Sequence, residues 1–267
     1  MLAHQTFTLA SSHQIPRLGL GTWLIPEDTV ASVVRDAVKL GYRHFDTAQA
    51  YGNERGVGEG VRTCGVDRSE LFVTTKVAAS IKNYADAAAS IQGSLDALGL
   101  DYLDLLLIHS PGSAGDDEVW RAMEEALHDG RVHSIGVSNF SESDLDRLST
   151  TSSTVPHVNQ IRIHPGHTPT ALMEYCAARG IVVEAYSPIG NGDLLTDPRL
   201  VDMAAGYGVS VARLCIRYTL QLGTVSLPKA RSVGHLRDNA EVDFEISDED
   251  MATLSGLVID VDLSGRD

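Results

Sequence analysis

The chain alternates along its whole length between short apolar runs, typical of strands, and longer stretches whose apolar residues recur at helical spacing. Eight strand-then-helix units follow one another, preceded by a hairpin pattern at 7–16 and followed by a last helical pattern at 248–257. The expected strands span residues 18–23, 42–45, 71–75, 103–108, 132–137, 157–161, 181–185 and 224–227, and the expected helices span residues 27–40, 54–63, 83–98, 116–129, 169–178, 198–222 and 232–240, with a further helix beginning after Ser141.

This repetition predicts a barrel of parallel strands surrounded by helices. The runs Leu105–Ile108 and Ile181–Val183 are continuously apolar, as expected for parallel strands that are buried on both faces. No linker rich in Pro, Gly or Ser and no shift in composition divides the chain. We therefore expect a single (β/α)8 TIM-barrel domain over residues 1–267, with an N-terminal β-hairpin and a C-terminal extra helix.

A doubly wound sheet is the main alternative fold, and it requires a glycine-rich dinucleotide fingerprint at its first turn. The segment GLGTWL at 19–24 lacks the third glycine of that fingerprint. A second glycine cluster, Gly56, Gly58 and Gly60, lies inside a helical pattern rather than after a strand. The local context of both glycine clusters thus argues against this fold.

The charge balance restricts the possible partners. With 36 acidic and 21 basic residues the formal net charge is -15, which disfavours nucleic acid and anionic membranes as partners. The first dozen residues resemble no signal peptide, and the apolar runs are too short to span a membrane. The three cysteines lack C-x-x-C spacing and are expected to be buried thiols in a reducing compartment. We expect a cytoplasmic monomer.

Chemically useful side chains follow three successive strands. Asp46 and Tyr51 follow the second strand, Lys76 the third and His109 the fourth, so a barrel would bring them together at one mouth. A lysine cation would lower the pKa of a neighbouring phenol and make it a better proton donor, while Asp46 would anchor the lysine. His109 would orient a substrate carbonyl. Asn53 is expected to cap the helix that begins at Glu54.

Each of these residues also has a plainer interpretation. Taken alone, His109 fits a hydrogen-bonded core histidine, Lys76 a solvated charge at a strand end, and Asp46 with Tyr51 a cap and a surface aromatic. A metal-dependent hydrolase is a rival function, because other histidines also lie near strands. No H-x-H or H-E-x-x-H spacing occurs, however, so we expect no metal. The histidines concerned are His44, His133, His157 and His164.

Seven motifs carry a resemblance to a known family, and they occur in this order: GLGTW, FDTAQAYGNE, TTK, LLLIHSP, IGVSNF, VNQIRIHP and LPKARS. Together they span nearly the whole chain, which resembles the aldo-keto reductase superfamily and, within it, the 2,5-diketogluconate reductase-like branch. The resemblance implies a (β/α)8 barrel that binds NADP(H) across its mouth and reduces aldehydes or ketones. It further implies that Tyr51 is the proton donor, that Lys76 and Asp46 tune it, and that His109 orients the carbonyl.

The resemblance also implies a cofactor site. Ser138, Asn139 and Gln160 would bind the nicotinamide carboxamide, and Tyr186 would stack on the ring. The pyrophosphate would follow the segment from Ser187. The full set of implied cofactor residues is Thr22, Trp23, Ser138, Asn139, Gln160, Tyr186, Ser187, Pro188, Ile189, Asn191, Lys229, Ala230, Arg231, Ser232, His235, Asp238 and Asn239, and the implied substrate residues are Trp23, Tyr51, His109 and Ser110.

Two departures from the family pattern affect specificity. Where NADP(H)-preferring members commonly carry Ser and Arg, this chain has Ala230 and His235. Because arginine grips a phosphate bidentately and a neutral histidine does not, we expect NADPH to be preferred with weakened discrimination against NADH. The loop 110–115 after the fourth strand is short, as is the tail after Leu257, so the substrate pocket should be open, with Trp23 as its main aromatic.

A non-catalytic regulatory barrel that binds NADP(H) is the second function that the resemblance allows. All four positions with chemical roles are filled by the expected residues, whereas a site that has lost its activity usually lacks one of them. We therefore predict an NAD(P)H-dependent oxidoreductase acting on CH–OH or carbonyl groups.

Overall fold

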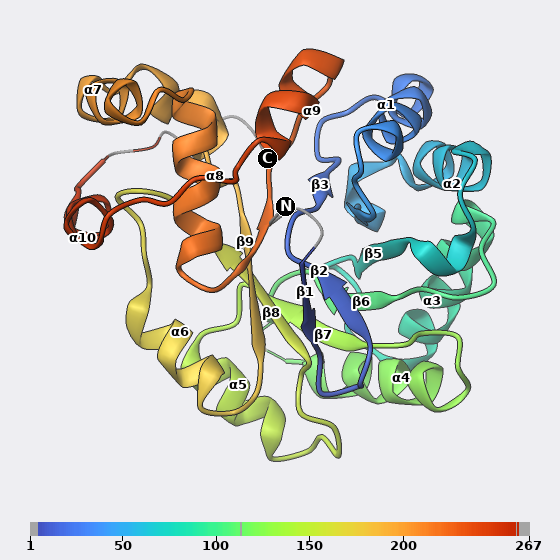
Figure 1. Ribbon diagram of the computed structural model, residues 1–267. Coiled ribbons are helices and arrows are strands. Elements are labelled where there is room, and N and C mark those ends of the chain that lie inside the picture. Colours follow the sequence, from blue (N-terminus) through green and yellow to red (C-terminus); the bar gives the residue numbers. More distant parts are fainter. Residues whose placement is uncertain (1–4, 113, 260, 262–267) are drawn as a thin grey trace.

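The computed structural model describes residues 5–112, 114–259 and 261, and its central feature is a parallel sheet whose strands surround a common axis (Figure 1). The sheet has eight strands in the order β10-β9-β8-β7-β6-β5-β4-β3. A parallel bridge from Leu18 to Ser226 brings the two edges together, which confirms the predicted barrel. The strands are β3 (Leu20–Gly21), β4 (His44–Asp46), β5 (Phe72–Val77), β6 (Leu105–Ile108), β7 (Ile135–Ser138), β8 (Val158–Arg162), β9 (Val182–Tyr186) and β10 (Val225–Leu227).

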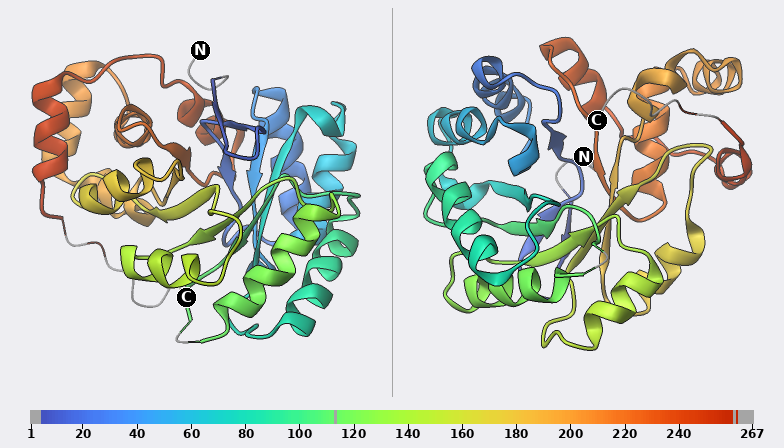
Figure 2. Two further views of the ribbon diagram at one scale, coloured as in Figure 1. Left: turned by 90° about the horizontal axis from the view of Figure 1, so that it is seen from below. Right: turned by 180° about the vertical axis from the view of Figure 1, so that it is seen from behind.

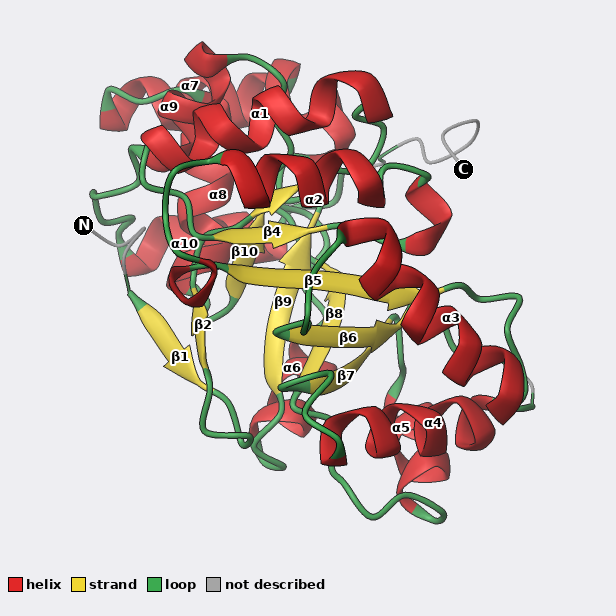
Figure 3. Ribbon diagram, turned by 90° about the vertical axis from the view of Figure 1, so that its right-hand side faces the viewer, coloured by secondary structure: helices red, strands yellow, loops and turns green. Residues whose placement is uncertain are grey.

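Helices cover the outside of the barrel (Figures 2 and 3). Apolar side chains on the outer faces of the strands pack against them and form the largest core cluster. The helices are α1 (Glu27–Lys39), α2 (Glu54–Thr63), α3 (Tyr84–Leu98), α4 (Asp116–His128), α5 (Glu142–Ser149), α6 (Thr170–Ala177), α7 (Pro198–Tyr207), α8 (Val211–Gln221), α9 (Val233–Ala240) and α10 (Asp248–Gly256). The predicted C-terminal extra helix is α10.

The expected helical stretch 198–222 is divided into α7 and α8. Gly208 ends α7 in the left-handed conformation, with a φ of 66°. Ser210 then caps α8, because its side chain accepts a hydrogen bond from the backbone N–H of Arg213. A glycine C-cap followed by a serine N-cap is a local signal for two helices that the apolar periodicity alone does not reveal.

Two further helix starts test the capping predictions. At α5, Ser141 and Asp144 form a capping box, which agrees with the helix start expected after Ser141. At α2, Asn53 occupies the N-cap position but its side chain makes no capping bond, so that prediction is wrong. Its Oδ1, the atom that would cap the helix, accepts instead from the Thr47 hydroxyl at 2.7 Å, and its Nδ2 donates to the buried carbonyl oxygens of Thr22 and Ile25, both at 2.9 Å.

The glycine cluster of α2 allows close helix packing rather than nucleotide binding. A Cβ at Gly58 would lie 2.0 Å from the carbonyl oxygen of Leu98 at the end of α3. A Cβ at Gly56 would lie 2.4 Å from the carbonyl oxygen of Glu27 in α1. Both neighbouring helices therefore approach the backbone of α2 directly, which only glycine permits.

The N-terminal hairpin closes the end of the barrel at which the strands begin. It consists of β1 (Thr6–Thr8) and β2 (Gln14–Pro16), which pair antiparallel as predicted. Leu9 and Ile15 are buried inside the barrel with side chains of the surrounding strands. That inner cluster also contains Phe72, Leu105, Leu107, Val158, Val225 and Leu227. The opposite end, where the strands finish, is left for polar side chains.

The cysteines are free thiols, as expected, but only two of the three are buried. Cys176 and Cys215 lie in the core, whereas Cys64 at the end of α2 is partly exposed. Among the residues that the structure describes, no helix combines the length and the apolar character needed to cross a membrane.

Candidate active site

The Lys76 ammonium group lies at the centre of the polar cluster at the carboxyl ends of the strands. Its Nζ donates to Oδ1 of Asp46 at 2.6 Å, to the carbonyl oxygen of Thr47 at 2.9 Å and to the hydroxyl of Tyr51 at 3.4 Å. An ammonium group has three N–H donors, so each has one acceptor. The structure thus brings Asp46, Tyr51 and Lys76 together as predicted.

Tyr51 faces His109 at the mouth of the barrel. Their rings lie edge to face with centroids 5.6 Å apart, and both side chains are partly exposed. Tyr51 ends a short 3-10 helix, η2 (Gln49–Tyr51). Gln49 holds this helix in place, since its Oε1 accepts from the N–H of Ala78 at 2.8 Å and its Nε2 donates to Ser94 at 3.0 Å. Sequence reasoning did not single out this supporting glutamine.

The pKa shifts in the cluster follow from burial and from the Lys76 charge. Burial raises the pKa of the Tyr51 hydroxyl, and the opposing effect of Lys76 does not compensate. The expected net lowering of this pKa is therefore wrong, although Lys76 acts in the expected direction. Burial alone would lower the pKa of Lys76, but the adjacent Asp46 carboxylate raises it. Burial and Lys76 together lower the pKa of His109 to about 4, so its imidazole is neutral near pH 7.

A second polar layer lies beneath the first, inside the barrel. Nε2 of Gln160 donates to Oδ2 of Asp46 at 2.9 Å and to Oε2 of Glu184 at 3.0 Å. Glu184 is fully buried, and its other oxygen lies 3.6 Å from Nε2 of His44. Sequence reasoning missed Glu184. The sequence does contain a signal for Glu184: it is a charged residue within the apolar run of β9, and it lies on the same face of the strand as Tyr186.

The residues expected at the nicotinamide carboxamide lie next to one another at the ends of β7, β8 and β9. The Tyr186 hydroxyl donates to Oδ1 of Asn139 at 2.8 Å, and Nδ2 of Asn139 donates to the carbonyl oxygen of His109 at 3.1 Å. Ser138 donates to the carbonyl oxygen of Gln160 at 2.9 Å. Asn139 has a φ of 62°, an unfavourable backbone conformation that these contacts maintain.

The segment after β9, expected to follow a pyrophosphate, is a tight turn. Ser187 and Asn191 have positive φ values of 51° and 56°, and the Ser187 hydroxyl donates to Oδ1 of Asn191 at 2.8 Å. Gly190 and Gly192 also have positive φ values. The backbone N–H groups of Gly190 and Gly192 donate to the carbonyl oxygens of Ser187 and Ile189, both at 2.9 Å, and so close the turn.

The residues expected at the adenosine end follow β10 and occupy different environments. Ser232 caps α9 by accepting from the N–H of His235 at 3.2 Å, and the His235 side chain is exposed. Arg231 donates to the carbonyl oxygen of Leu24, which ties this segment to the loop after β3. Lys229 Nζ lies 5.9 Å from the centre of the Trp23 ring.

Four of the implied cofactor residues are buried or hydrogen-bonded within the protein. Thr22 is buried, and its hydroxyl donates to the carbonyl oxygen of Asp46 at 2.9 Å. Ala230 and Asn239 are also buried. Asp238 accepts from Ser210 at 2.6 Å. Their contact with a cofactor stays a prediction.

The loop after β6 borders the substrate end, and Ser113 within it lies outside the described residues. Both carboxylate oxygens of Asp116 accept from the N–H of Gly112, at 3.0 and 2.8 Å. Lys82 and Arg147 pair with the same carboxylate at 3.4 and 3.2 Å. This buried carboxylate thus fixes the end of the short loop, while Ser110 at its start remains partly exposed.

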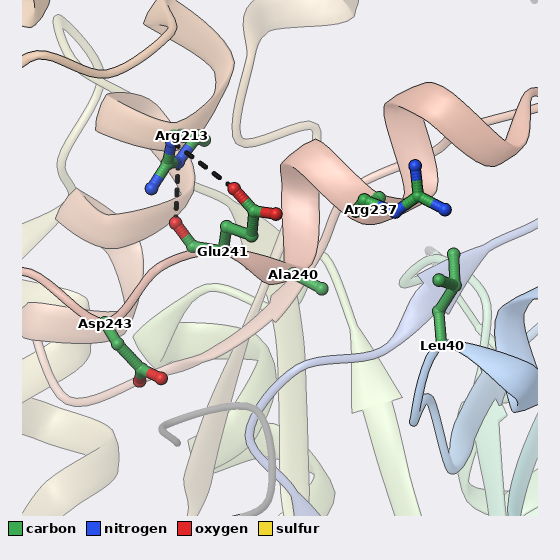
Figure 4. Close-up of a pocket in the computed structure, with 6 residues that line it drawn as sticks. All are labelled: Leu40, Arg213, Arg237, Ala240, Glu241 and Asp243. Carbon is green, nitrogen blue, oxygen red and sulfur yellow. Dashed lines mark hydrogen bonds and ion pairs between the residues drawn. The ribbon is translucent and has the colours of Figure 1, made fainter.

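Two surface hollows lie away from this polar cluster. One, of about 310 Å³, lies between the end of α1, α8 and the segment after α9, where Arg213 pairs with Glu241 at 3.6 Å (Figure 4). The other, of about 570 Å³, lies beside the starts of α5 and α6. Neither is lined by the four residues with predicted chemical roles, so we base the site on the strand ends.

Comparison with known proteins decides the family. The sequence pattern described as the Aldo/keto reductase family matches residues 17–259. The chain belongs to this family. The resemblance inferred from the seven motifs is thus confirmed, and the protein is an NAD(P)H-dependent oxidoreductase as predicted.

Relatives within the aldo/keto reductase family match over almost their full length. Glyoxal reductase of Bacillus subtilis (strain 168) is 41% identical over 254 residues, covering 94% of this chain and 92% of that protein. An aldo/keto reductase of Brucella melitensis has a crystal structure with a TM-score of 0.91 at 38% identity, covering 96% of this chain and 98% of that one. The Bombyx mori aldo-keto reductase, solved in complex with NADP, has a TM-score of 0.87 at 33% identity, covering 94% and 92%.

Proposed function

We propose that this aldo/keto reductase family member reduces aldehydes or ketones to alcohols with NADPH, and that Tyr51 donates the proton. The observation that carries the proposal is the set of three hydrogen bonds made by Lys76, of which one reaches the Tyr51 hydroxyl at 3.4 Å. A cation fixed in this way stabilises the phenolate that remains after proton transfer. The bound dinucleotide supplies the hydride.

The proton-transfer step assigns different roles to Tyr51 and His109. The neutral imidazole of His109 donates a hydrogen bond to the carbonyl oxygen of the substrate and orients it toward Tyr51. As negative charge develops on that oxygen, the Tyr51 phenol transfers its proton to it. The raised pKa of Tyr51 keeps the phenol protonated before the reaction, and Lys76 compensates part of the cost of forming the phenolate.

The residues around the mouth fit a nicotinamide dinucleotide phosphate. Tyr186 offers an aromatic face, and the amide of Gln160 keeps its carbonyl oxygen available, because its nitrogen is directed to two carboxyl groups. Lys229 and Arg231 supply positive charge to an otherwise acidic chain. We propose that NADPH is preferred but that NADH is also accepted, since His235 offers no permanent cation to the 2′-phosphate.

A non-catalytic regulatory barrel that binds NADP(H) is the alternative function. The complete set Asp46, Tyr51, Lys76 and His109 favours catalysis, because a barrel that only senses the cofactor has no need of a buried ion pair beside a phenol. Such a pair is costly to desolvate. Turnover measurements distinguish the two functions directly.

The test is NADPH oxidation, followed at 340 nm, with methylglyoxal, an aryl aldehyde and a diketo sugar acid as substrates. We expect turnover with at least one of them and slower turnover with NADH at equal concentration. The named activity of the Bacillus subtilis relative makes a small dicarbonyl the first choice. Tight NADPH binding without turnover of any substrate would favour the regulatory barrel, and absence of NADPH binding would overturn both.

A further inference from the structure

Glu184 is a buried acid that the proposed reaction does not use. It lies on β9 opposite Gln160 of β8, and its alternating position matches that of Tyr186 at the mouth. Its side chain therefore points into the barrel, one layer beneath the nicotinamide site of the proposed function. The residue is fully buried. A buried acid at such a position is costly unless its contacts are specific.

The contacts of Gln160 with Glu184 and Asp46 together determine the orientation of its amide. Nε2 of Gln160 lies 3.0 Å from Oε2 of Glu184 and 2.9 Å from Oδ2 of Asp46. The two N–H groups of the amide thus have one carboxyl oxygen each. If the amide were flipped, its carbonyl oxygen would face the Asp46 carboxylate, and two acceptors would repel each other. The pair of acids therefore leaves the carbonyl oxygen of Gln160 for another donor.

The surroundings of Glu184 favour its protonated form. Among the residues that the structure describes, Oε1 of Glu184 has no hydrogen-bond partner, and the Lys76 ammonium is committed to three other acceptors. Burial and the Asp46 charge raise the pKa of Glu184 to about 8. Nε2 of His44 lies 3.6 Å from this oxygen, and burial lowers the pKa of His44 to about 4, so the imidazole is neutral and one of its two nitrogens carries no hydrogen.

The tautomer of His44 agrees with this protonation state. Nδ1 of His44 lies 3.4 Å from the carbonyl oxygen of Pro16, which only accepts, so the ring hydrogen belongs on Nδ1. Nε2 is then an acceptor, which faces both the Thr74 hydroxyl at 3.2 Å and the Glu184 acid. Glu184 is thus a neutral acid whose O–H points to His44 and whose C=O accepts from Gln160.

We propose that Glu184 is a positioning residue that holds the Gln160 amide with its carbonyl oxygen toward the mouth, where it accepts a hydrogen bond from the carboxamide N–H of the bound cofactor. This inference rests on the proposed function. Glu184 then affects the binding of the nicotinamide end of the dinucleotide only. The adenosine end and the reacting groups Tyr51 and His109 keep their contacts when Glu184 is replaced.

The experiment compares two substitutions and two dinucleotides. Glu184→Met is similar in length but cannot accept from Gln160, whereas Glu184→Gln keeps an acceptor for Gln160 and an N–H for His44. Dissociation constants are measured by protein fluorescence for NADPH and for reduced 3-acetylpyridine adenine dinucleotide phosphate, whose methyl ketone replaces the carboxamide and has no N–H. The ratio of the two constants within one protein does not depend on the fraction that is folded.

We expect Glu184→Met to weaken NADPH binding by roughly tenfold, the effect of one hydrogen bond, and the acetylpyridine analogue by less than about twofold. The Glu184→Gln variant should bind both dinucleotides with the same dissociation constants as the unsubstituted protein. Equal losses for the two dinucleotides, or a Gln variant as weak as the Met variant, would overturn the inference. If Glu184→Met does not fold, Glu184→Leu replaces it in the same comparison.

Failure of the proposed function gives a different result. An unsubstituted protein that does not bind NADPH would overturn the proposed function, and with it the role of Glu184. An unsubstituted protein that binds NADPH and prefers it to the analogue, but whose preference survives in Glu184→Met, would overturn the role of Glu184 alone.

Discussion

Nζ of Lys76 lies 2.6 Å from Oδ1 of Asp46, and the two side chains are only 1% and 5% exposed. A pair of opposite charges at this depth is costly to desolvate, so each charge depends on the other for its place in the fold. The pair joins strands β4 and β5 beside Tyr51. Substitutions can therefore separate the contribution of the pair to the stability of the fold from its effect on Tyr51.

We predict that Lys76→Met lowers the free energy of unfolding by about 3 to 5 kcal/mol, because it leaves the Asp46 carboxylate buried without a counter-charge. The double substitution Asp46→Asn with Lys76→Met removes both charges and should regain a large part of that loss. Urea unfolding measures both effects. The double variant should still lack reductase activity; if it regained activity, Lys76 would have no part in proton transfer.

Tyr51→Phe removes the phenolic hydroxyl and little else. We expect the turnover number to fall by about 10² to 10⁴-fold, the usual contribution of a positioned general acid, with the dissociation constant for NADPH nearly unchanged. Stopped-flow oxidation of NADPH and fluorescence titration measure the two quantities. Loss of both activity and NADPH binding would mean that the substitution damages the fold, and full activity would rule out Tyr51 as the proton donor.

The low pKa of His109 predicts that activity persists to a lower pH than an ordinary histidine would allow. An ordinary histidine titrates near 6.5, whereas burial and Lys76 lower the pKa of His109 to about 4. The neutral imidazole is then retained down to about pH 5, and activity should fall only as the pH approaches 4. The same shift affects stability. Because the pKa of His109 is lower in the folded than in the unfolded chain, its contribution to the free energy of unfolding is present above pH 6.5 and is lost as the pH falls toward 4. A break in kcat near pH 6.5 that disappears in His109→Gln would contradict this prediction.

His235→Arg tests the expected contact with the 2′-phosphate. His235 is exposed, so the added guanidinium acts through solvent and its effect should be modest. We expect KM for NADPH to fall by roughly two- to fivefold, with KM for NADH unchanged, because only NADPH carries this phosphate. Initial rates with each dinucleotide provide the comparison. Equal changes for both dinucleotides would place the contact elsewhere.

Two glycines offer a matched test of helix packing. Gly58→Ala should destabilise the fold by about 1 to 3 kcal/mol, because its Cβ would lie 2.0 Å from the carbonyl oxygen of Leu98. Gly93 lies on the exposed face of α3, and a Cβ there would meet no described atom within 4 Å, so Gly93→Ala should stabilise the fold by about 0.5 to 1 kcal/mol. Thermal unfolding of the two variants should shift in opposite directions. Shifts of the same sign would contradict the direct contact between α2 and α3.

The strand ends were predictable because each apolar run stops at a polar residue of distinct chemistry, as at Asp46 and His109. Helix α2 was predicted with its observed bounds. The capping role of Asn53 was not correctly predicted, because its Oδ1 accepts from Thr47 after β4 and its Nδ2 donates to Thr22 and Ile25, which lie on a loop that is distant in sequence. Sequence periodicity describes neighbours along one element and contains no information about such partners.

The electrostatics of the site depends on tertiary structure in the same way. The effect of Lys76 on Tyr51 followed from their chemistry, but the larger effect of burial on the pKa of Tyr51 depends on the side chains that the closed barrel packs around it. Glu184 was visible as an acid in an apolar run. That it meets Gln160, and through it Asp46, depends on the registers of β8 with β9 and of β4 in the closed sheet.

The hairpin β1–β2 seals the end of the barrel opposite the strand-end cluster, with Leu9 and Ile15 inserted among the inner side chains. An anchor joined to the chain near Gln5 therefore attaches on the closed side. An enzyme immobilised in this way on a bead or an electrode would face the solution with its open side, and diffusion of carbonyl compounds and dinucleotide to the surface-bound protein would remain unobstructed.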